Sequence, residues 1–168
     1  IIEPSCGSCS STWMECHQVI FVDSFHERAG STNVIHLHGE ALKNASTLHP
    51  YESYEIDHNN PNIHIGDKAP DGSQLRPYVI FFNEDIELRL WKASVEATKQ
   101  ANVFIVVGST MLVYPAAELL KMIPPKCELY IIDPSEVALP EGCNRECIHI
   151  QSGASLGLQQ LKATLKLK

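Results

Sequence analysis

Short apolar segments rich in β-branched residues recur along the chain, separated by polar or turn-forming residues. They occupy residues 18–22, 34–37, 78–82, 103–107, 129–132 and 147–150. Continuous apolar runs of this length predict strands that are buried on both faces, as in a parallel sheet.

Helical periodicity appears between these segments. Ile86, Leu90, Ala93, Ala97 and Ala101 recur at helical spacing. The same spacing relates Leu158, Leu161 and Leu165, and Pro115 is well placed to open another helix. Alternating strands and helices predict an α/β fold, with a mostly parallel sheet covered by helices.

One long segment, residues 41–75, does not follow this pattern. It is polar and contains the turn-forming pairs His49-Pro50, Asn60-Pro61 and Asp71-Gly72. We expect an inserted lobe with little regular structure, because a loop of this length in a compact domain usually has a binding role or is disordered.

Composition narrows the class of protein. The chain has 168 residues, of which 44% are hydrophobic and 20% charged, which is ordinary for a globular domain. Thirteen basic residues against twenty acidic ones leave a net charge of -7, and no basic cluster stands out, so we expect no nucleic-acid partner. No apolar run approaches the roughly 20 residues that a bilayer requires, so we expect no membrane partner either.

The six cysteines lie near the two ends of the chain, with none between Cys16 and Cys127. With no secretory leader in view, this distribution favours reduced thiols in a cytoplasmic protein over a disulfide framework. Cys6 and Cys9 have the spacing of zinc ligands, but a single pair of this kind near a terminus is weak evidence for a zinc site, and reduced thiols are the preferred interpretation.

Two short motifs offer candidate chemistry. Gly108-Ser109-Thr110 follows an apolar strand directly, which suits either a ligand site at the carboxyl end of a strand or a tight turn with a helix cap. His36 and His38 lie two residues apart before Gly39, so His38 would stand at a strand end. Such a histidine serves either as a catalyst or as a satisfied polar residue. No Gly-x-Gly pair occurs in the sequence, so a glycine-rich dinucleotide or phosphate loop cannot be drawn.

Read together, segments 22–40 (VDSFHERAGSTNVIHLHGE), 75–84 (LRPYVIFFNE) and 103–117 (VFIVVGSTMLVYPAA) resemble the sirtuins, the NAD-dependent protein-lysine deacylases. The likeness continues through residues 132–135 and 152–155, and it is greatest to bacterial members of the deacylase type. It implies a Rossmann-like, mostly parallel sheet with helices on both faces, in three layers. The implied organisation is a catalytic domain formed by residues 18–40 and 75–168, a small lobe at 41–74, and an unmatched segment at 1–17.

The resemblance also implies roles for individual residues. His38 matches the catalytic histidine, which takes a proton from a ribose hydroxyl after the acyl oxygen has attacked C1′ of the ribose and nicotinamide has left. Residues that match the NAD-binding segments are Asp23, Gly108, Ser109, Thr110, Val113, Asp133 and Ala154. Residues that match the segment holding the acyl-lysine peptide are Ile80, Phe82, Asn83 and Glu84. The implied products are the deacylated lysine and an O-acyl-ADP-ribose.

The chain departs from the family at several points. The glycine-rich unit that opens the family's domain and cradles the pyrophosphate is absent from the sequence, so it reads as the C-terminal part of the domain. Asn83 stands where the family has glycine. Residues 41–75 contain no cysteine, so the thiolate zinc site of many sirtuins cannot form there, and the irregularly spaced His49, His58 and His64 lead us to expect no metal.

Two functions remain in view. The first is an NAD-dependent protein deacylase acting on acyl-lysine proteins or peptides, with NAD as co-substrate. The alternative is a non-catalytic sirtuin-like module that binds peptides or other proteins, because loss of the glycine-rich loop removes amides that bind pyrophosphate. The same loss would expose apolar sheet surface and favour self-association.

Overall fold

The structure is a computed structural model that describes residues 18–20, 22–57, 59–109 and 114–165. Contacts within the chain cluster into two compact units. We refer to residues 18–91 as the N-terminal unit and to the described residues from 92 onward as the C-terminal unit. Helix α2 (Leu88–Gln100) crosses the boundary between them.

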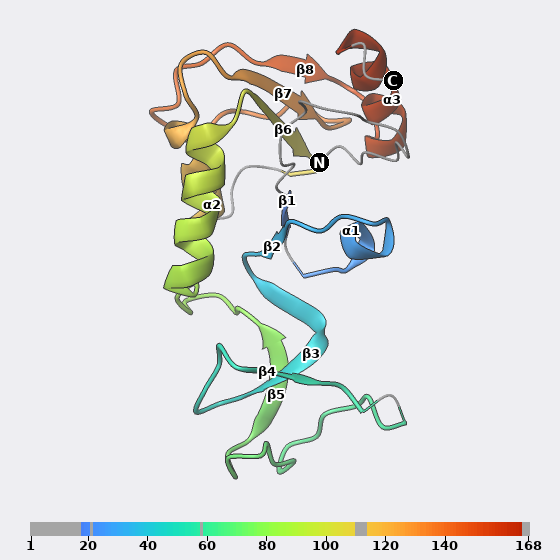
Figure 1. Ribbon diagram of the computed structural model, residues 1–168, viewed down its shortest axis with the longest axis vertical. Coiled ribbons are helices and arrows are strands. Elements are labelled where there is room, and N and C mark those ends of the chain that lie inside the picture. The colour runs from blue at the N-terminus through green and yellow to red at the C-terminus, as the bar shows by residue number, and fades with distance from the viewer. Residues whose placement is uncertain (1–17, 21, 58, 110–113, 166–168) are drawn as a thin grey trace. The chain divides into compact units, whose positions relative to one another are not determined.

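A parallel three-stranded sheet forms the centre of the C-terminal unit (Figure 1). Its strands are β6 (Val103–Val107), β7 (Glu128–Ile132) and β8 (Ile148–Ile150), with β7 in the middle. A 3₁₀ helix, η1 (Ala116–Met122), precedes β7, and α3 (Ala154–Thr164) follows β8. The helix predicted after Pro115 is therefore present, but with the tighter 3₁₀ geometry.

Strand β7 is buried on both faces. Leu129 and Ile131 pack with Leu120 of η1 on one side of the sheet. Tyr130 and Ile132 pack with Leu161 of α3 on the other. Because successive side chains alternate between faces, the continuous apolar run demands cover on both sides. This arrangement confirms the predicted α/β class, with helices on both faces of a parallel sheet.

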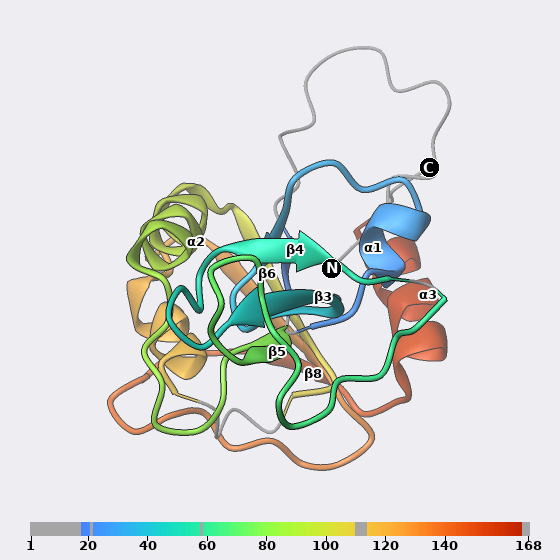
Figure 2. The same ribbon diagram turned by 90° about the horizontal axis from the view of Figure 1, so that it is seen from below.

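The N-terminal unit contains two small sheets. In one, β1 (Gln18–Ile20) pairs in parallel with β2 (Val34–His36), and helix α1 (Phe25–Arg28) lies between them in the sequence. The other is antiparallel and has the order β4 (Ser53–Glu55), β3 (Gly39–Ser46), β5 (Leu75–Val79), which Figure 2 shows clearly.

The expectation of little regular structure at 41–75 is wrong for part of that segment, since it contains most of β3 and all of β4. The pairing register of β3 with β5 shifts between Gly39 and Asn44, so the alternation of buried and exposed residues is broken and no period of two is visible. The strand predicted at 78–82 runs instead from Leu75 to Val79. Pro77 is tolerated there because β5 is an edge strand of this sheet.

Among the described residues, no helix has the length and apolar character needed to cross a bilayer.

Gly39, the first residue of β3, is a position where only glycine fits. Its φ is 88°, and a Cβ built on it would lie 2.2 Å from the carbonyl oxygen of Tyr78. We predict that Gly39→Ala lowers the free energy of unfolding by about 2–4 kcal/mol, from left-handed strain plus the backbone clash. Urea unfolding measures the loss. Gly66→Ala is the matched control, because Gly66 has φ 104° but open space around it, and should cost only about 1–2 kcal/mol. Equal losses in the two variants would contradict the clash.

Candidate functional site

His38 lies in the turn between β2 and β3. Strand β2 ends at His36, and Leu37 and His38 form the turn before Gly39. The Leu37 N–H donates to the Ile35 carbonyl at 3.1 Å, and the Leu37 side chain is only 1% exposed. The strand predicted at 34–37 therefore ends one residue early, at His36, because the chain turns there, and His38 lies in the turn just beyond the strand end.

The His38 imidazole is half-buried. This burial lowers the pKa of His38 below its usual value of 6.5, because the charged form loses hydration. At neutral pH the ring is therefore held in its neutral form, which has a nitrogen lone pair able to accept a proton.

The segment that follows β5 is bonded to this turn. The Ile80 N–H donates to the His38 carbonyl at 2.9 Å, so the predicted substrate-binding segment begins beside the predicted catalytic residue. Phe82 is 95% exposed at the tip of the next turn. Asn83 has φ 68°, a left-handed conformation that asparagine tolerates better than most residues other than glycine. Glycine, the residue that the resemblance leads us to expect at this position, also adopts a left-handed conformation readily.

A residue that the sequence did not single out, Arg76, holds this turn. Its guanidinium donates to both carboxylate oxygens of Glu84, at 2.5 and 2.7 Å, and to the Val79 carbonyl at 2.8 Å. The Glu84 carboxylate also accepts from the Phe81 N–H at 2.8 Å. The hydrogen bond from Arg76 is the main cause that holds the pKa of Glu84 below its ordinary value. Arg76 lies in the apolar segment LRPYV, and nothing in the letters alone links it to Glu84.

Two of the predicted NAD-binding residues, Gly108 and Asp133, lie at the carboxyl edge of the C-terminal sheet. Gly108 follows β6, and its N–H donates to the Ile132 carbonyl at 3.0 Å. Asp133 follows β7, and its N–H donates to the Ile150 carbonyl at 3.3 Å. Parallel register brings these strand ends together, as expected for an open α/β sheet.

The remaining predicted residues differ in position. Ser109 is half-buried and follows Gly108, and Ala154 is the exposed first residue of α3. Thr110 and Val113 lie outside the described residues. Asp23 belongs to the N-terminal unit, where its Oδ1 accepts from the Phe25 N–H at 3.0 Å at the start of α1.

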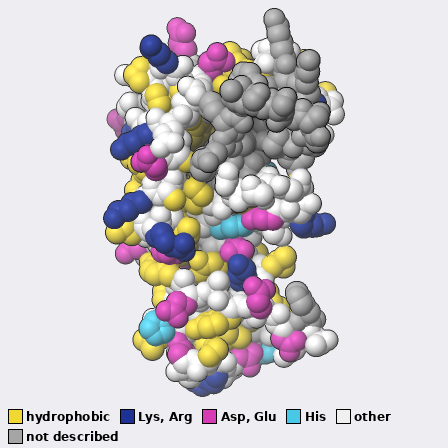
Figure 3. Space-filling view, in the orientation of Figure 1, with side chains coloured by type: hydrophobic (Ala, Val, Ile, Leu, Met, Phe, Trp, Pro, Cys, Tyr) yellow, Lys and Arg dark blue, Asp and Glu magenta, His cyan; other side chains and the backbone are white. Residues whose placement is uncertain are grey.

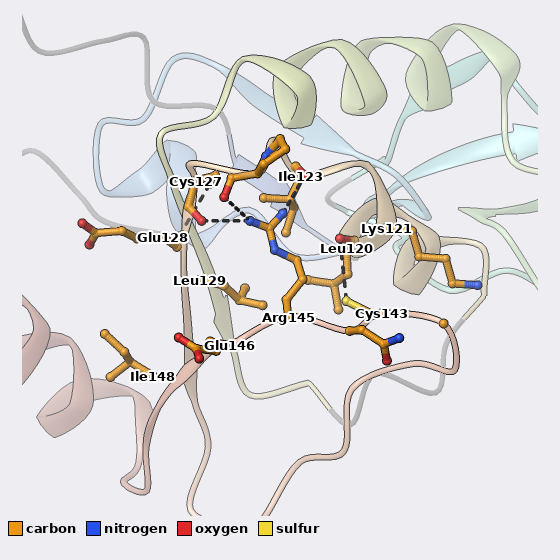
Figure 4. A pocket seen from close by; sticks show the side chains of 13 residues that line it. Leu120, Lys121, Ile123, Cys127, Glu128, Leu129, Cys143, Arg145, Glu146 and Ile148 are labelled. Carbon is orange, nitrogen blue, oxygen red and sulfur yellow. Dashed lines mark hydrogen bonds between the residues drawn. The ribbon is translucent and has the colours of Figure 1, made fainter.

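A hollow of about 730 Å³ lies at the other end of the C-terminal sheet, where β7 and β8 begin (Figure 4). Arg145 is one of the residues that line the hollow. Its guanidinium donates to the carbonyls of Ile123, Pro124 and Cys127 at 2.6 to 3.1 Å. These hydrogen bonds fix the loop that leads into β7. The hollow is thus braced by Arg145 and lies away from the edge that holds Gly108 and Asp133.

The described residues contain no group of three histidine, cysteine or acidic side chains arranged to hold a metal ion. On the face shown in Figure 3, Lys and Arg side chains are scattered among Asp and Glu side chains rather than gathered in one patch.

Comparisons with known proteins agree with the resemblance seen in the motifs. The model of the Sir2 family matches residues 11–115, a match that begins within segment 1–17. An NAD-dependent protein deacylase of Bacteroides thetaiotaomicron is 40% identical over 149 residues, which cover 86% of this chain and 61% of that protein. The chain thus spans about three-fifths of the length of this curated relative.

Solved structures of Sir2 homologues are similar as well. A mutant Sir2 homologue in complex with ADP-ribose has 31% sequence identity and a TM-score of 0.71, covering 88% of this chain and 59% of that chain. A Sir2 homologue–NAD complex has 30% identity and a TM-score of 0.71, covering 86% of this chain and 56% of that chain.

The link between Arg76 and Glu84 generates a pH-dependent prediction. Because the folded-state pKa of Glu84 is lowered, its carboxylate stabilises the fold above its ordinary pKa of 4.5 and loses that effect as the pH falls through the lowered value. We expect Glu84→Gln to be less stable than the wild type near neutral pH, and the difference to vanish as Glu84 becomes protonated. Urea unfolding from about pH 7 to about pH 3 measures this. Glu52→Gln, at an exposed glutamate, is the control, and a difference for Glu84→Gln that persists in acid would contradict the pairing.

Proposed function

Because this chain belongs to the Sir2 family, we propose that it acts in the NAD-dependent removal of acyl groups from lysine side chains, with His38 as general base. The observation that carries the proposal is the His38 turn: a half-buried histidine with a lowered pKa, bonded through its backbone to a segment with an exposed tip. The printed names of the bacterial relatives, NAD-dependent protein deacylases, support the same reaction.

The proposed role of His38 follows from its protonation state. A general base must be unprotonated and have a pKa near the working pH. Burial keeps the imidazole of His38 neutral at physiological pH, so that it can take a proton from a ribose hydroxyl. That hydroxyl would then attack the imidate carbon, and addition of water would release the lysine amine and leave the acyl group on the ribose as O-acyl-ADP-ribose.

NAD would supply an electrophilic ribose carbon and a nicotinamide leaving group. The proposed contacts are Asp23, Gly108, Ser109, Thr110, Val113, Asp133 and Ala154. The carboxyl edge of the C-terminal sheet suits a ribose: the Asp133 carboxylate has about four acceptor positions, and the Ser135 N–H, at 2.8 Å from Oδ1, occupies one of them. The open space beside Gly108 leaves room for a ligand to approach the backbone.

The proposed substrate is an acyl-lysine protein or peptide held by Ile80, Phe82, Asn83 and Glu84. An extended peptide is recognised mainly through backbone hydrogen bonds, with side chains as walls. The turn braced by Arg76 offers both an exposed backbone and the exposed ring of Phe82. We further propose a cytoplasmic location and no resident metal.

A second candidate is a peptide-binding module without NAD turnover. The lack of any Gly-x-Gly pair in the 168 residues favours it, since such a loop commonly supplies amides for pyrophosphate. Calorimetry with NAD separates the two candidates: micromolar binding by this chain supports the enzyme. No binding, together with a larger particle in gel filtration, supports the module and its self-association.

The role of His38 is tested by substitution. We expect the wild-type chain, given NAD and an acyl-lysine peptide, to release nicotinamide, and His38→Ala to slow turnover by about 100-fold or more, the usual contribution of a general base. His64→Ala is the control, because the His64 side chain is 71% exposed and lies in the 41–74 segment. Turnover that survives His38→Ala unchanged would remove His38 from the mechanism.

The pH dependence of turnover gives an independent check. A base must be deprotonated to act, so kcat/KM should fall on the acidic side, with a midpoint at the pKa of free-enzyme His38. Burial places this midpoint below 6.5. An acidic limb centred above 6.5 would contradict the burial of the ring or its role as base.

A further inference from the structure

His36, the last residue of β2, connects three elements of the N-terminal unit through its side chain. Its Nε2 lies 2.5 Å from Glu27 Oε1 on α1 and 3.9 Å from Glu40 Oε2 on β3. Glu40 in turn accepts a hydrogen bond from Lys43 at 3.0 Å. The His36 side chain is only 11% exposed, whereas the Glu27 side chain is 39% exposed, so the hydrogen bond is shielded from water on the side of the histidine.

The contacts of His36 with Glu27 and Glu40 lie next to the turn that carries His38. His36 and Glu40 flank the three residues from 37 to 39, and their side chains approach to 3.9 Å across the two ends of the turn without a hydrogen bond between them. The other side of the turn is held by backbone contacts, from the Ile80 N–H to the His38 carbonyl and from Gly39 to Tyr78. Between them, the two sets of contacts leave the turn little freedom to shift.

The two ring nitrogens of His36 have different surroundings. Nε2 faces the carboxylates, whereas Nδ1 is buried with no hydrogen-bond partner among the described atoms. A hydrogen on Nδ1 would be a buried donor left unpaired, which is costly. The network therefore favours the tautomer with its hydrogen on Nε2, donating to Glu27.

We infer that His36 is a positioning residue, which together with Glu27 and Glu40 fixes the turn so that the His38 ring keeps its half-buried place. The inference rests on the proposed function for its catalytic consequence, since His36 acts only through His38. A displacement of about 1 Å in a catalytic group is enough to cost up to about 100-fold in rate.

The test compares two substitutions at His36. Phe keeps a planar ring but removes the hydrogen bond, whereas the side-chain amide of Gln keeps a donor near the position of Nε2. NMR titration of the His38 ring is the primary measurement, because it needs no turnover. We expect the pKa of His38 in His36→Phe to rise toward its ordinary value as the turn loosens, and His36→Gln to retain the wild-type value. His64→Phe, in the 41–74 segment, is the control and should leave the His38 titration unchanged.

A partner variant guards against misfolding of His36→Phe. Glu27→Ala removes the carboxylate nearest to His36, at a side chain that is 39% exposed. We expect this substitution to raise the pKa of His38, as His36→Phe does. In turnover assays both variants should lower kcat by about 10- to 100-fold, with KM for NAD and peptide unchanged. His36→Gln should restore kcat.

The outcomes separate this inference from the proposed function. An unchanged pKa of His38 in both His36→Phe and Glu27→Ala overturns the inference. A loss of kcat in His36→Gln as large as the loss in His36→Phe also overturns it. A shifted titration supports the positioning role by itself. If His38→Ala then proved as active as the wild type, the proposed function would fail while the positioning role remained.

Discussion

The close approach of the Gly39 backbone to the Tyr78 carbonyl is the contact on which the geometry of the N-terminal unit depends. It lets β3 begin directly against the end of β5, and this brings the Ile80 N–H to the His38 carbonyl. Because glycine at position 39 has no side chain, the His38 turn and the 80–84 segment can lie next to each other. The proximity of His38 to the predicted substrate-binding segment follows from that pairing.

Charged side chains hold the two turns that the backbone contacts bring next to each other. Arg76 and Glu84 brace the turn that exposes Phe82, and His36 with Glu27 and Glu40 braces the turn that carries His38. Partly exposed ion pairs contribute modestly to stability. These pairs also connect segments that are short and lack a large core of their own, so they fix loop geometry as well. A site built on turns needs such support, because turns lack the regular hydrogen bonding of helices and strands.

The C-terminal unit uses a different principle. Its sheet is held by a core on each face, with Ile131 on one side and Ile132 on the other almost fully buried. Gly157 of α3 allows that helix to lie close to the sheet, since a Cβ there would meet the Ile132 side chain at 2.3 Å. This rigid sheet presents Gly108 and Asp133 at one edge. That edge carries two of the residues that we propose to contact NAD.

The run of apolar residues at 129–132 was sufficient to predict a strand buried on both faces. Successive side chains of a strand point to opposite faces, so a continuous apolar run puts apolar side chains on both. Three motifs in order were sufficient to indicate the family, and the choice of His38 among eight histidines stays a prediction from that likeness. The sequence did not reveal β3 and β4, because a register shift hides the alternation on which strand prediction relies. Nor did it reveal the partners of Arg76 and His36. The Arg76–Glu84 contact forms because the chain folds back just after β5, and the His36–Glu27 contact forms because α1 lies beside the end of β2, so the folded structure alone decided them.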